Sequence, residues 1–198
     1  MDFPSLISFT LFASVAAFTP GPNNIMLTAS GANFGFRRSL PHVLGITFGF
    51  CSLLLAAGFG LAGLFSMVPE LYEVMRYLSI AYLFFLAWKI ATAERGCRDA
   101  KAKPITFLQA AAFQIINPKG VSVIISATTA YVSGVDRMAA EIFVLVFIFF
   151  IVTLPATLAW TLFGTVIATF LKTERFRRAF NILMALLLVI SLLPALLK

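Results

Sequence analysis

The sequence predicts an all-α integral membrane protein, because its composition and patterning identify lipid as the solvent. Hydrophobic residues make up 61% of the 198 residues, charged residues 12%, and the mean hydropathy is +0.98. Six apolar runs are each long enough to cross a hydrocarbon core, which takes about 20 helical residues. The runs lack the alternation of barrel strands, and lipid offers no partner to unpaired backbone groups, so helices are required.

Charged and turn-rich breaks separate the six predicted transmembrane spans. They cover about residues 4 to 32, 40 to 68, 70 to 93, 104 to 132, 139 to 171 and 176 to 197. We expect a single transmembrane domain, 1–198, made of two three-span halves of about 1–95 and 104–198. Three crossings are an odd number, so two halves with a common ancestral fold must be inverted repeats.

The basic residues between the spans predict the orientation of the chain. Ten of the fifteen Lys and Arg residues fall in loops on one side: Arg37, Arg38, Arg95, Arg98, Lys101, Lys103, Lys172, Arg175, Arg177 and Arg178. The other side has Arg76, Arg137 and Lys198. The positive-inside rule therefore places both termini outside the cytoplasm. The net charge of +7 reflects this topology, and nucleic acid is not an expected partner.

Proline interrupts the first and the fourth predicted span. The Pro20-Gly21-Pro22 segment removes two backbone donors and loosens the chain between them. Pro118 breaks the fourth span in the same way. Pro4 and Pro104 open the two halves sixteen and fourteen residues before these breaks. The breaks therefore occupy corresponding places in the two halves.

Two breaks with polar residues attached predict a binding site, because unwound backbone at membrane depth is tolerated only inside protein or beside water. Each break starts a half-helix whose amino-terminal amides and positive dipole end favour an anion. Carbonyls freed before the first break, those of Ala16 and Phe18, favour an ammonium group. A small zwitterion such as an amino acid has a carboxylate for the helix starts and an ammonium group for the freed carbonyls. The predicted substrate-binding residues are Pro20, Gly21, Pro22, Asn23, Asn24, Gln114, Asn117, Pro118, Lys119 and Gly120.

Lys119 lies deep within a predicted span, where an ammonium group costs at least about 2.5 to 3.5 kcal/mol. It could pair with a substrate carboxylate or exchange protons during transport. The alternative is a structural role, in which it satisfies carbonyls at the Pro118 break. Thr28, Ser122 and Ser126 follow the breaks at helical spacing and are weaker candidates for lining a substrate pathway.

Other small or polar residues are interpreted as structural. Gly31 and Gly35, and likewise Gly45 and Gly49, recur at the interval that lets helices pack closely. His42 is the single histidine, and its place near the predicted cytoplasmic end of span two favours an interface role over a proton relay.

The sequence gives little support for catalysis. It contains no Gly-x-Ser-x-Gly or His-Glu-x-x-His pattern and no carboxylate deep within a span, so neither a metal site nor a cofactor is expected. Cys51 and Cys97 fall at different depths, which argues against a disulfide. The alternatives left open are a membrane redox carrier or enzyme, and a membrane scaffold that transports nothing. A homo-oligomer in the bilayer is also left open.

The residues around both breaks resemble a known family of transporters. Phe18-Thr-Pro-Gly-Pro-Asn-Asn24 and Gln114-Ile-Ile-Asn-Pro-Lys-Gly120 are similar to segments of the lysine exporter and homoserine/threonine exporter superfamily. Ser30 to Gly49, Ala81 to Ile90 and Lys103 to Phe107 look most like its cysteine/O-acetylserine exporter branch. The resemblance implies a bacterial inner-membrane exporter, not an enzyme. It would export a small amino acid or related metabolite by alternating access, driven by the proton gradient.

One departure from the family pattern concerns the substrate. Many relatives carry an acidic residue soon after the second glycine of span two, where this chain has Phe50 and Cys51. A cationic substrate such as lysine is therefore disfavoured. The thiol-redox and metal-exporting branches place cysteine, histidine or acidic residues near the breaks, and this sequence has none there. The resemblance thus implies a neutral amino acid.

Overall fold

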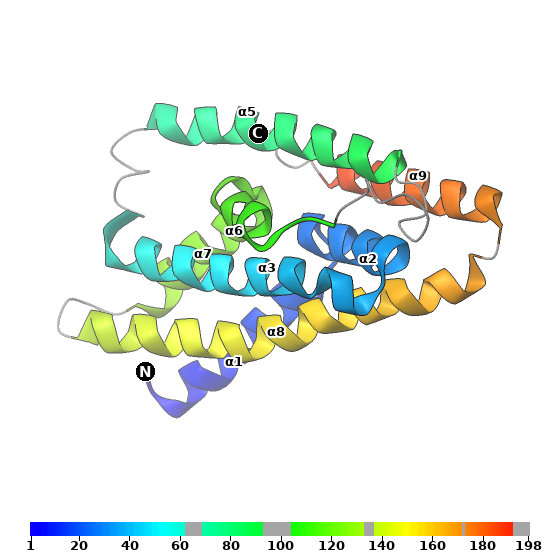
Figure 1. Cartoon of the computed structure of the whole chain (residues 1–198). Coiled ribbons are helices and arrows are strands. Elements are labelled where there is room, and N and C mark those ends of the chain that lie inside the picture. The colour runs from blue at the N-terminus through cyan, green and yellow to red at the C-terminus, as the bar shows by residue number, and fades with distance from the viewer. Residues whose placement is uncertain (62–68, 93–103, 133–136, 172, 192–198) are drawn as a thin grey trace.

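The computed structural model describes residues 1–61, 69–92, 104–132, 137–171 and 173–191, which form helices and short connections with no strand among them. The helices lie side by side in an elongated bundle (Figure 1). In chain order they are α1 (Phe3–Phe18), α2 (Pro22–Phe34), α3 (Phe36–Ala56), the short π-helix η1 (Ala57–Leu61), α5 (Pro69–Ala91), α6 (Phe107–Ile116), α7 (Pro118–Tyr131), α8 (Met138–Phe170) and α9 (Glu174–Ile190).

Two helical stretches in the described part are long and apolar enough to cross a membrane, namely Phe36–Gly60 and Met138–Phe170. The pairs α1 with α2 and α6 with α7 also qualify if each bent pair counts as one span. These four stretches coincide with predicted spans one, two, four and five. Helices α5 and α9 occupy the other two, where α5 has a shorter apolar stretch over Ile80–Ala91. The structure thus supports two to four crossings, and the six-span arrangement stays a prediction.

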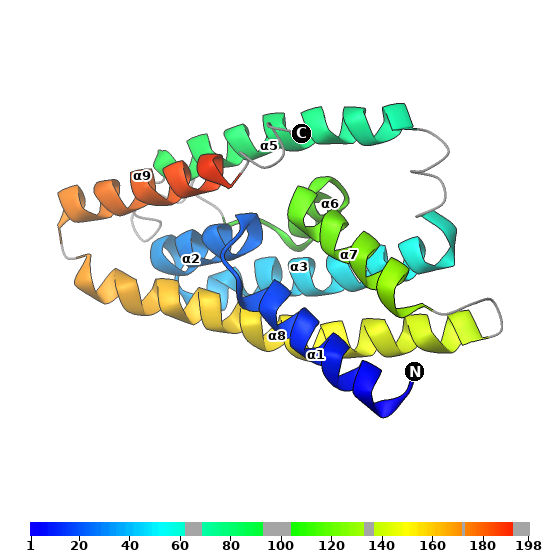
Figure 2. The ribbon, with the colours of Figure 1, turned by 180° about the vertical axis from the view of Figure 1, so that it is seen from behind.

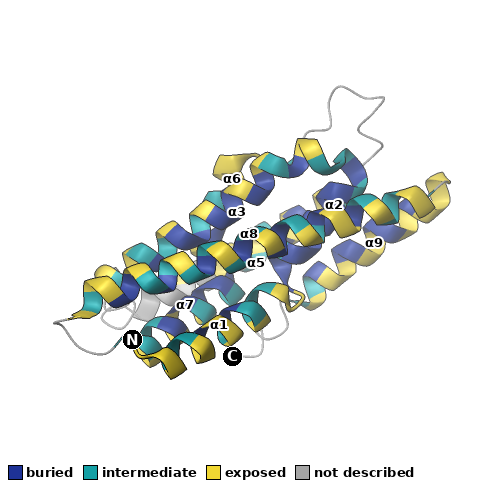
Figure 3. Ribbon diagram, turned by 90° about the horizontal axis from the view of Figure 1, so that it is seen from below, coloured by how far each residue is buried: buried dark blue, intermediate teal, exposed yellow. Residues whose placement is uncertain are grey.

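The outer surface of the bundle is apolar, as a lipid-facing surface must be. Large hydrophobic side chains stand exposed on most of the described helices, among them Phe3, Trp88, Leu108, Phe170 and Phe176. Figure 3 shows such exposed residues along the outer faces of α1 and α9. A soluble monomer rarely exposes apolar surface on this scale. Together with the long apolar helices, this surface indicates a helical multi-pass membrane protein.

The first helix break follows from the local sequence. Asp2 caps the start of α1 by accepting a hydrogen bond from the Ser5 amide at 3.0 Å. Helix α1 ends at Phe18, and the residue before Pro20 adopts an extended conformation, as residues before proline prefer. Helix α2 then begins at Pro22, because proline suits the first helical position. The two helices differ in direction by 51°.

The second break repeats this pattern. Thr106 and Gln109 form a capping box at the start of α6, each side chain bonding the backbone amide of the other. Asn117 is extended because it precedes Pro118, which occupies the first position of α7. Helices α6 and α7 are bent by 64°. Both predicted breaks are therefore present, and proline chemistry explains each.

Two glycines hold α2 against α8. A side chain at Gly31 would collide with the Thr161 carbonyl, and one at Gly164 would collide with the Thr28 carbonyl. The backbones of the two helices therefore touch directly, on opposite sides of the same crossing. Gly31 has the packing role that its spacing predicts.

Helix α3 approaches α6 in the same manner. A Cβ atom at Gly45 would meet the Phe107 carbonyl, and one at Gly49 would lie 2.6 Å from the Cα atom of Ala111. Gly35 does not follow this expectation, since no atom lies within 4 Å of its position for a Cβ atom. Its φ of 80° lies in the left-handed region that glycine tolerates, and it turns the chain from α2 into α3.

The buried core consists of two main clusters, and each broken helix pair contributes to both. One cluster joins α2, α5, α6 and α9 through residues that include Met26, Leu83, Phe113, Met184 and Leu188. The other joins α1, α3, α7 and α8 through residues that include Phe9, Leu54, Ile124, Leu145 and Phe149. Helices α1 and α7 contact each other (Figure 2), and a third, smaller cluster joins α2, α3 and α6 through Leu27, Ile46 and Ala110.

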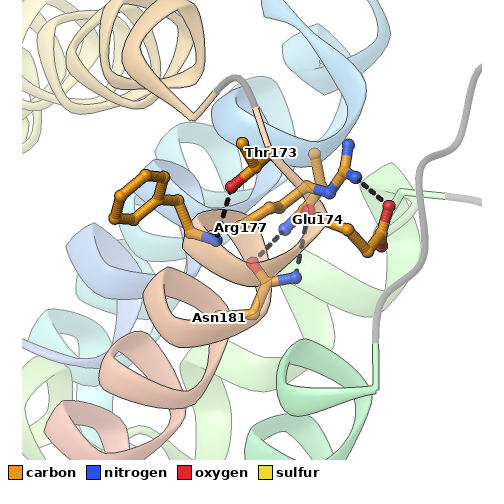
Figure 4. A network of polar contacts seen from close by, with 6 residues as sticks. Thr173, Glu174, Arg177 and Asn181 are labelled. Carbon is orange, nitrogen blue, oxygen red and sulfur yellow. Dashed lines mark hydrogen bonds and ion pairs between the residues drawn. The ribbon is translucent and has the colours of Figure 1, made fainter.

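Two charged side chains that the sequence places near loops are buried. The Glu141 carboxylate lies 3.5 Å from the amino group of Met1. Arg177 donates to the Glu174 carboxylate at 2.6 Å, one turn before an Asn181 side chain that faces α2 (Figure 4). Both lie within two turns of a helix start, where the helix already packs against its neighbours.

Several residues used to predict the orientation, or considered for redox chemistry, lie outside the described residues. They are Arg95, Cys97, Arg98, Lys101, Lys103, Lys172 and Lys198. The side chain of Arg76 is likewise not described. The placement of both termini outside the cytoplasm therefore stays a prediction.

Candidate binding site at the two helix breaks

An amide pair joins the two breaks. Asn23, in the first turn of α2, donates from Nδ2 to Oε1 of Gln114 at 2.8 Å, and Gln114 donates from Nε2 to Oδ1 of Asn23 at 3.2 Å. The buried Gln114 side chain also donates to the Ala110 carbonyl at 2.8 Å. Two segments 91 residues apart in the chain are thus fixed in one place. Both residues belong to the predicted site.

Lys119 forms a second link between the breaks. Its Nζ atom donates a hydrogen bond to the Thr19 carbonyl at 2.6 Å. The ammonium group therefore lies at the carboxyl end of α1, where the helix dipole favours a cation. The sequence leaves open a structural role for Lys119, in which it satisfies carbonyls at the Pro118 break. The structure instead shows it bound to a carbonyl of the opposite break.

Gly21 provides the room for Lys119. A Cβ atom on Gly21 would lie 2.7 Å from Cδ and 3.2 Å from Nζ of the lysine. The φ of Gly21 is −171°, an extended value that any residue can adopt. Glycine is therefore needed here for the close approach of the lysine and not for an unusual backbone conformation.

The Asn24 side chain donates to backbone carbonyls that could otherwise accept hydrogen bonds from the ammonium group of a substrate. Its Nδ2 atom donates to the carbonyls of Ala17 and Thr19, both at 2.9 Å. The sequence predicts free carbonyls in this segment. The carbonyls that side chains bind are those of Ala17 and Thr19, which neighbour the Ala16 and Phe18 carbonyls that the sequence predicts to be free. Backbone groups left open by a break are commonly satisfied in this way.

Asn117 offers an acceptor instead. Its side chain is buried, and Nδ2 makes one long contact of 3.5 Å with Oε1 of Gln114. Its Oδ1 atom has no hydrogen-bond partner among the described residues. A buried carbonyl oxygen without a donor is costly, and a ligand ammonium group would relieve that cost.

A cavity lies between these residues. It has an empty volume of about 520 Å³, including the space at its open mouth. Seven of the ten predicted binding residues line it: Gly21, Pro22, Asn23, Asn24, Asn117, Lys119 and Gly120. The other three, Pro20, Gln114 and Pro118, do not line it. The two prolines form the helix breaks, and Gln114 forms the amide pair with Asn23.

The three weaker candidates lie elsewhere. Thr28 is buried against Gly164 and donates to the Asn24 carbonyl at 2.8 Å, without reaching the cavity. Ser122 and Ser126 are exposed on the far side of α7. None of the three lines the cavity in this conformation.

The opposite wall comes from helices that the sequence did not associate with the site. Ile46 and Phe50 of α3 face Phe149 of α8, with the two phenylalanine rings 5.0 Å apart. Thr153 and Thr157 of α8 add hydroxyl groups to this wall. One signal was available in the sequence: threonine recurs at every fourth position of α8 at 153, 157, 161, 165 and 169. This spacing puts the hydroxyl groups on one helix face.

The cavity combines three kinds of chemistry. Lys119 supplies a positive charge, and the starts of α2 and α7 supply amides that no side chain caps. Asn117 supplies an acceptor, and the two phenylalanines supply an apolar surface. The lining residues include no carboxylate. The site therefore suits a carboxylate, an ammonium group and a small uncharged side chain, and it disfavours a second positive charge.

Comparison with known proteins bears on this site. A family model described as LysE type translocator matches residues 14–192, which include both breaks and every residue that lines the cavity. The cysteine/O-acetylserine efflux protein of Escherichia coli (strain K12) is 35% identical over 131 residues, 65% of this chain and 67% of that protein. The protein of the same name from Salmonella typhimurium (strain LT2) is 32% identical over the same shares. No solved structure matches the chain.

Proposed function

Because this chain belongs to the LysE type translocator family, we propose that it exports a small neutral amino acid or a related metabolite across the bacterial inner membrane. The family match confirms the resemblance noted in the sequence. The family and the names of the similar proteins point to a transporter rather than an enzyme. Cysteine and O-acetylserine, which those names give, are the first substrates to test.

The observation that carries this proposal is the meeting of Lys119 and Asn117 at one cavity. The substrate carboxylate would bind Lys119 and the amides at the starts of α2 and α7. Its ammonium group would bind the free Oδ1 atom of Asn117. The side chain would lie against Phe50 and Phe149. A neutral amino acid then leaves no buried charge without a partner.

The proposed transport cycle is alternating access, with six spans arranged as two inverted repeats of about 1–95 and 104–198. The meeting of the two helix breaks at the cavity supports it, because half-helices that hinge at these breaks could open the cavity to alternate sides. Both termini would lie outside the cytoplasm. The proton gradient would drive the export step, with one proton moving inward as a substrate molecule moves outward.

Transport can be tested with purified protein in liposomes. We expect exchange of labelled cysteine or O-acetylserine across the bilayer, inhibited by other small neutral amino acids and not by lysine. Cells that overproduce the protein should release the same substrate and resist its toxic analogue. If neither liposomes nor cells show flux for any amino acid in a full panel, the proposed function is wrong.

A further inference from the structure

We propose that Thr153 of α8 selects the side chain of the substrate through a hydrogen bond. The site would then prefer neutral amino acids whose side chain carries an oxygen or sulfur atom over aliphatic amino acids of the same size. This inference rests on the proposed function, which assigns partners to the carboxylate and the ammonium group of the substrate. For the substrate side chain, that function so far provides only an apolar surface.

Thr153 is the exception in the row of threonines on α8. The four that follow it each donate a hydrogen bond from Oγ1 to a carbonyl three or four residues earlier, at 2.7 to 3.0 Å: Thr157, Thr161, Thr165 and Thr169. A threonine within a helix commonly bonds its own helix in this way. The Thr153 hydroxyl makes no hydrogen bond with any residue that the structure describes. It is therefore available to another partner.

The burial of Thr153 makes such a partner favourable. The residue is 8% exposed, and it lines the cavity between the helix breaks. A hydroxyl group enclosed by protein loses hydrogen bonds to water, and this loss is costly unless another group replaces them. A molecule in the cavity could be that group. Because a threonine hydroxyl both donates and accepts, it suits an ester carbonyl, a hydroxyl or a thiol.

The other hydroxyl group on this wall of the cavity is already engaged. Thr157 donates to the carbonyls of Thr153 and Leu154, both at 2.9 Å, and its Oγ1 atom lies 3.5 Å from that of Thr47. The rest of the wall that α3 and α8 form is apolar and consists of Ile46, Phe50, Phe149 and Ala156. Thr153 is thus the polar contact that this wall can offer to a substrate.

The arrangement of the cavity directs the substrate side chain toward Thr153. Lys119 and Asn117, the proposed partners of the carboxylate and the ammonium group, both belong to the second break. Thr153 lies on the opposite wall, one helical turn after Phe149. A side chain that reaches this wall can contact the Phe149 ring and the Thr153 hydroxyl together. An aliphatic side chain would leave the hydroxyl unpaired, which is the physical basis of the selection.

The experiment compares wild-type protein with Thr153→Val, in which a methyl group replaces the hydroxyl. For exchange of labelled substrate in liposomes, we measure the concentration of each competing amino acid that halves the rate. The competitors form two pairs of similar size: O-acetylserine with homoleucine, and cysteine with 2-aminobutyrate. We expect Thr153→Val to lower the preference for O-acetylserine over homoleucine by about three- to tenfold, the effect of one hydrogen bond. The cysteine pair should change less, because a thiol bonds weakly.

The preference is a ratio within one protein sample, so a change in folding or yield does not alter it. Thr153→Ser keeps the hydroxyl and should keep the preference. Thr161→Val is the matched control, because it removes a buried hydroxyl from the same row that bonds the Thr157 carbonyl and does not line the cavity. It should leave both ratios unchanged. If Thr153→Val does not insert into the membrane, Thr153→Ala is measured in its place with the same expected loss.

Several results would overturn the inference. Thr153→Val could keep the wild-type ratio for O-acetylserine and homoleucine, even if all exchange becomes slower, which would show that the hydroxyl does not contact the substrate. An equal loss in Thr161→Val, or a loss in Thr153→Ser, would also exclude selection by this hydroxyl. So would a wild type that exchanges other amino acids and is inhibited by neither O-acetylserine nor cysteine. A wild type that exchanges no amino acid contradicts the proposed function instead.

Discussion

Lys119 of α7 donates its ammonium group to the carbonyl of Thr19, the residue that ends α1, 2.6 Å away and 100 residues earlier in the chain. This bond ties the amino end of one half-helix to the carboxyl end of another. It also places the positive charge at the cavity that Gly21 and Asn117 line. Substitutions here should therefore separate substrate binding from assembly of the fold.

Lys119→Met should reduce transport by at least about tenfold, because a carboxylate in the cavity would lose its counter-charge. Lys119→Arg should transport little better than Lys119→Met, because a planar guanidinium is wider than the space above Gly21. Exchange in liposomes measures the effect, and protein yield in the membrane controls for folding. Arg137→Gln, at the exposed start of α8, is the matched control. Wild-type rates in Lys119→Met would show that the lysine is structural.

Gly21→Ala should raise the substrate KM more than it lowers the maximal rate. The added methyl group would displace the lysine side chain, whose Cδ atom would lie 2.7 Å from it, without changing the backbone. In the double variant with Lys119→Met, the alanine should cost nothing further, because both changes act on one contact. A double-mutant cycle of transport rates tests this. Additive losses would show that Gly21 affects transport through a contact other than the one with Lys119.

Gln114→Leu should destabilise the protein by about 1–3 kcal/mol, because it leaves the Asn23 amide inside the bundle without its partner. The double variant Asn23→Leu/Gln114→Leu should recover part of this loss, since no unpaired amide then remains. Thermal unfolding in detergent gives the comparison. A double variant less stable than either single variant would contradict the assigned pairing.

Gly164→Val should prevent stable folding, because its side chain would collide with the Thr28 carbonyl where α2 and α8 touch. Leu162→Val, on an exposed face of the same helix, should be tolerated. Size-exclusion profiles after membrane extraction distinguish the two. A folded Gly164→Val protein would show that α2 and α8 can separate at this point.

Ser122→Ala and Ser126→Ala should leave transport within about twofold of wild type, because both side chains are exposed in this conformation. The sequence interpretation, in which they line a substrate pathway, predicts a larger loss. Initial rates of exchange decide between the two. A marked loss would mean that α7 turns this face inward in another state of the cycle.

Both helix breaks could be predicted from the sequence, because proline acts through the residues beside it. The contacts across the breaks could not be predicted, since they join residues far apart in the chain. Nothing near Lys119 indicates that its partner is Thr19, and nothing near Asn24 predicts that it closes the end of α1. Long-range packing alone determines these partners.

The helices that form the opposite wall of the cavity could not be predicted from the sequence either. The spacing of threonines on α8 marks a polar face, but which helix it meets depends on the crossing at Gly31 and Gly164. His42 was expected at an interface because of its place near a span end, and it is fully buried on α3, which packs against α2, α6 and α8. Sequence periodicity shows which residues share a face of one helix, and it does not show which other helix that face contacts.

The glycine contacts couple the two breaks mechanically. Helix α2, which follows the first break, lies with its backbone against α8, and α6, which precedes the second break, lies against α3. In the proposed cycle, bending at one break would therefore load these contacts and the amide pair of Asn23 and Gln114 that joins the breaks. The two hinges would then bend together and not independently.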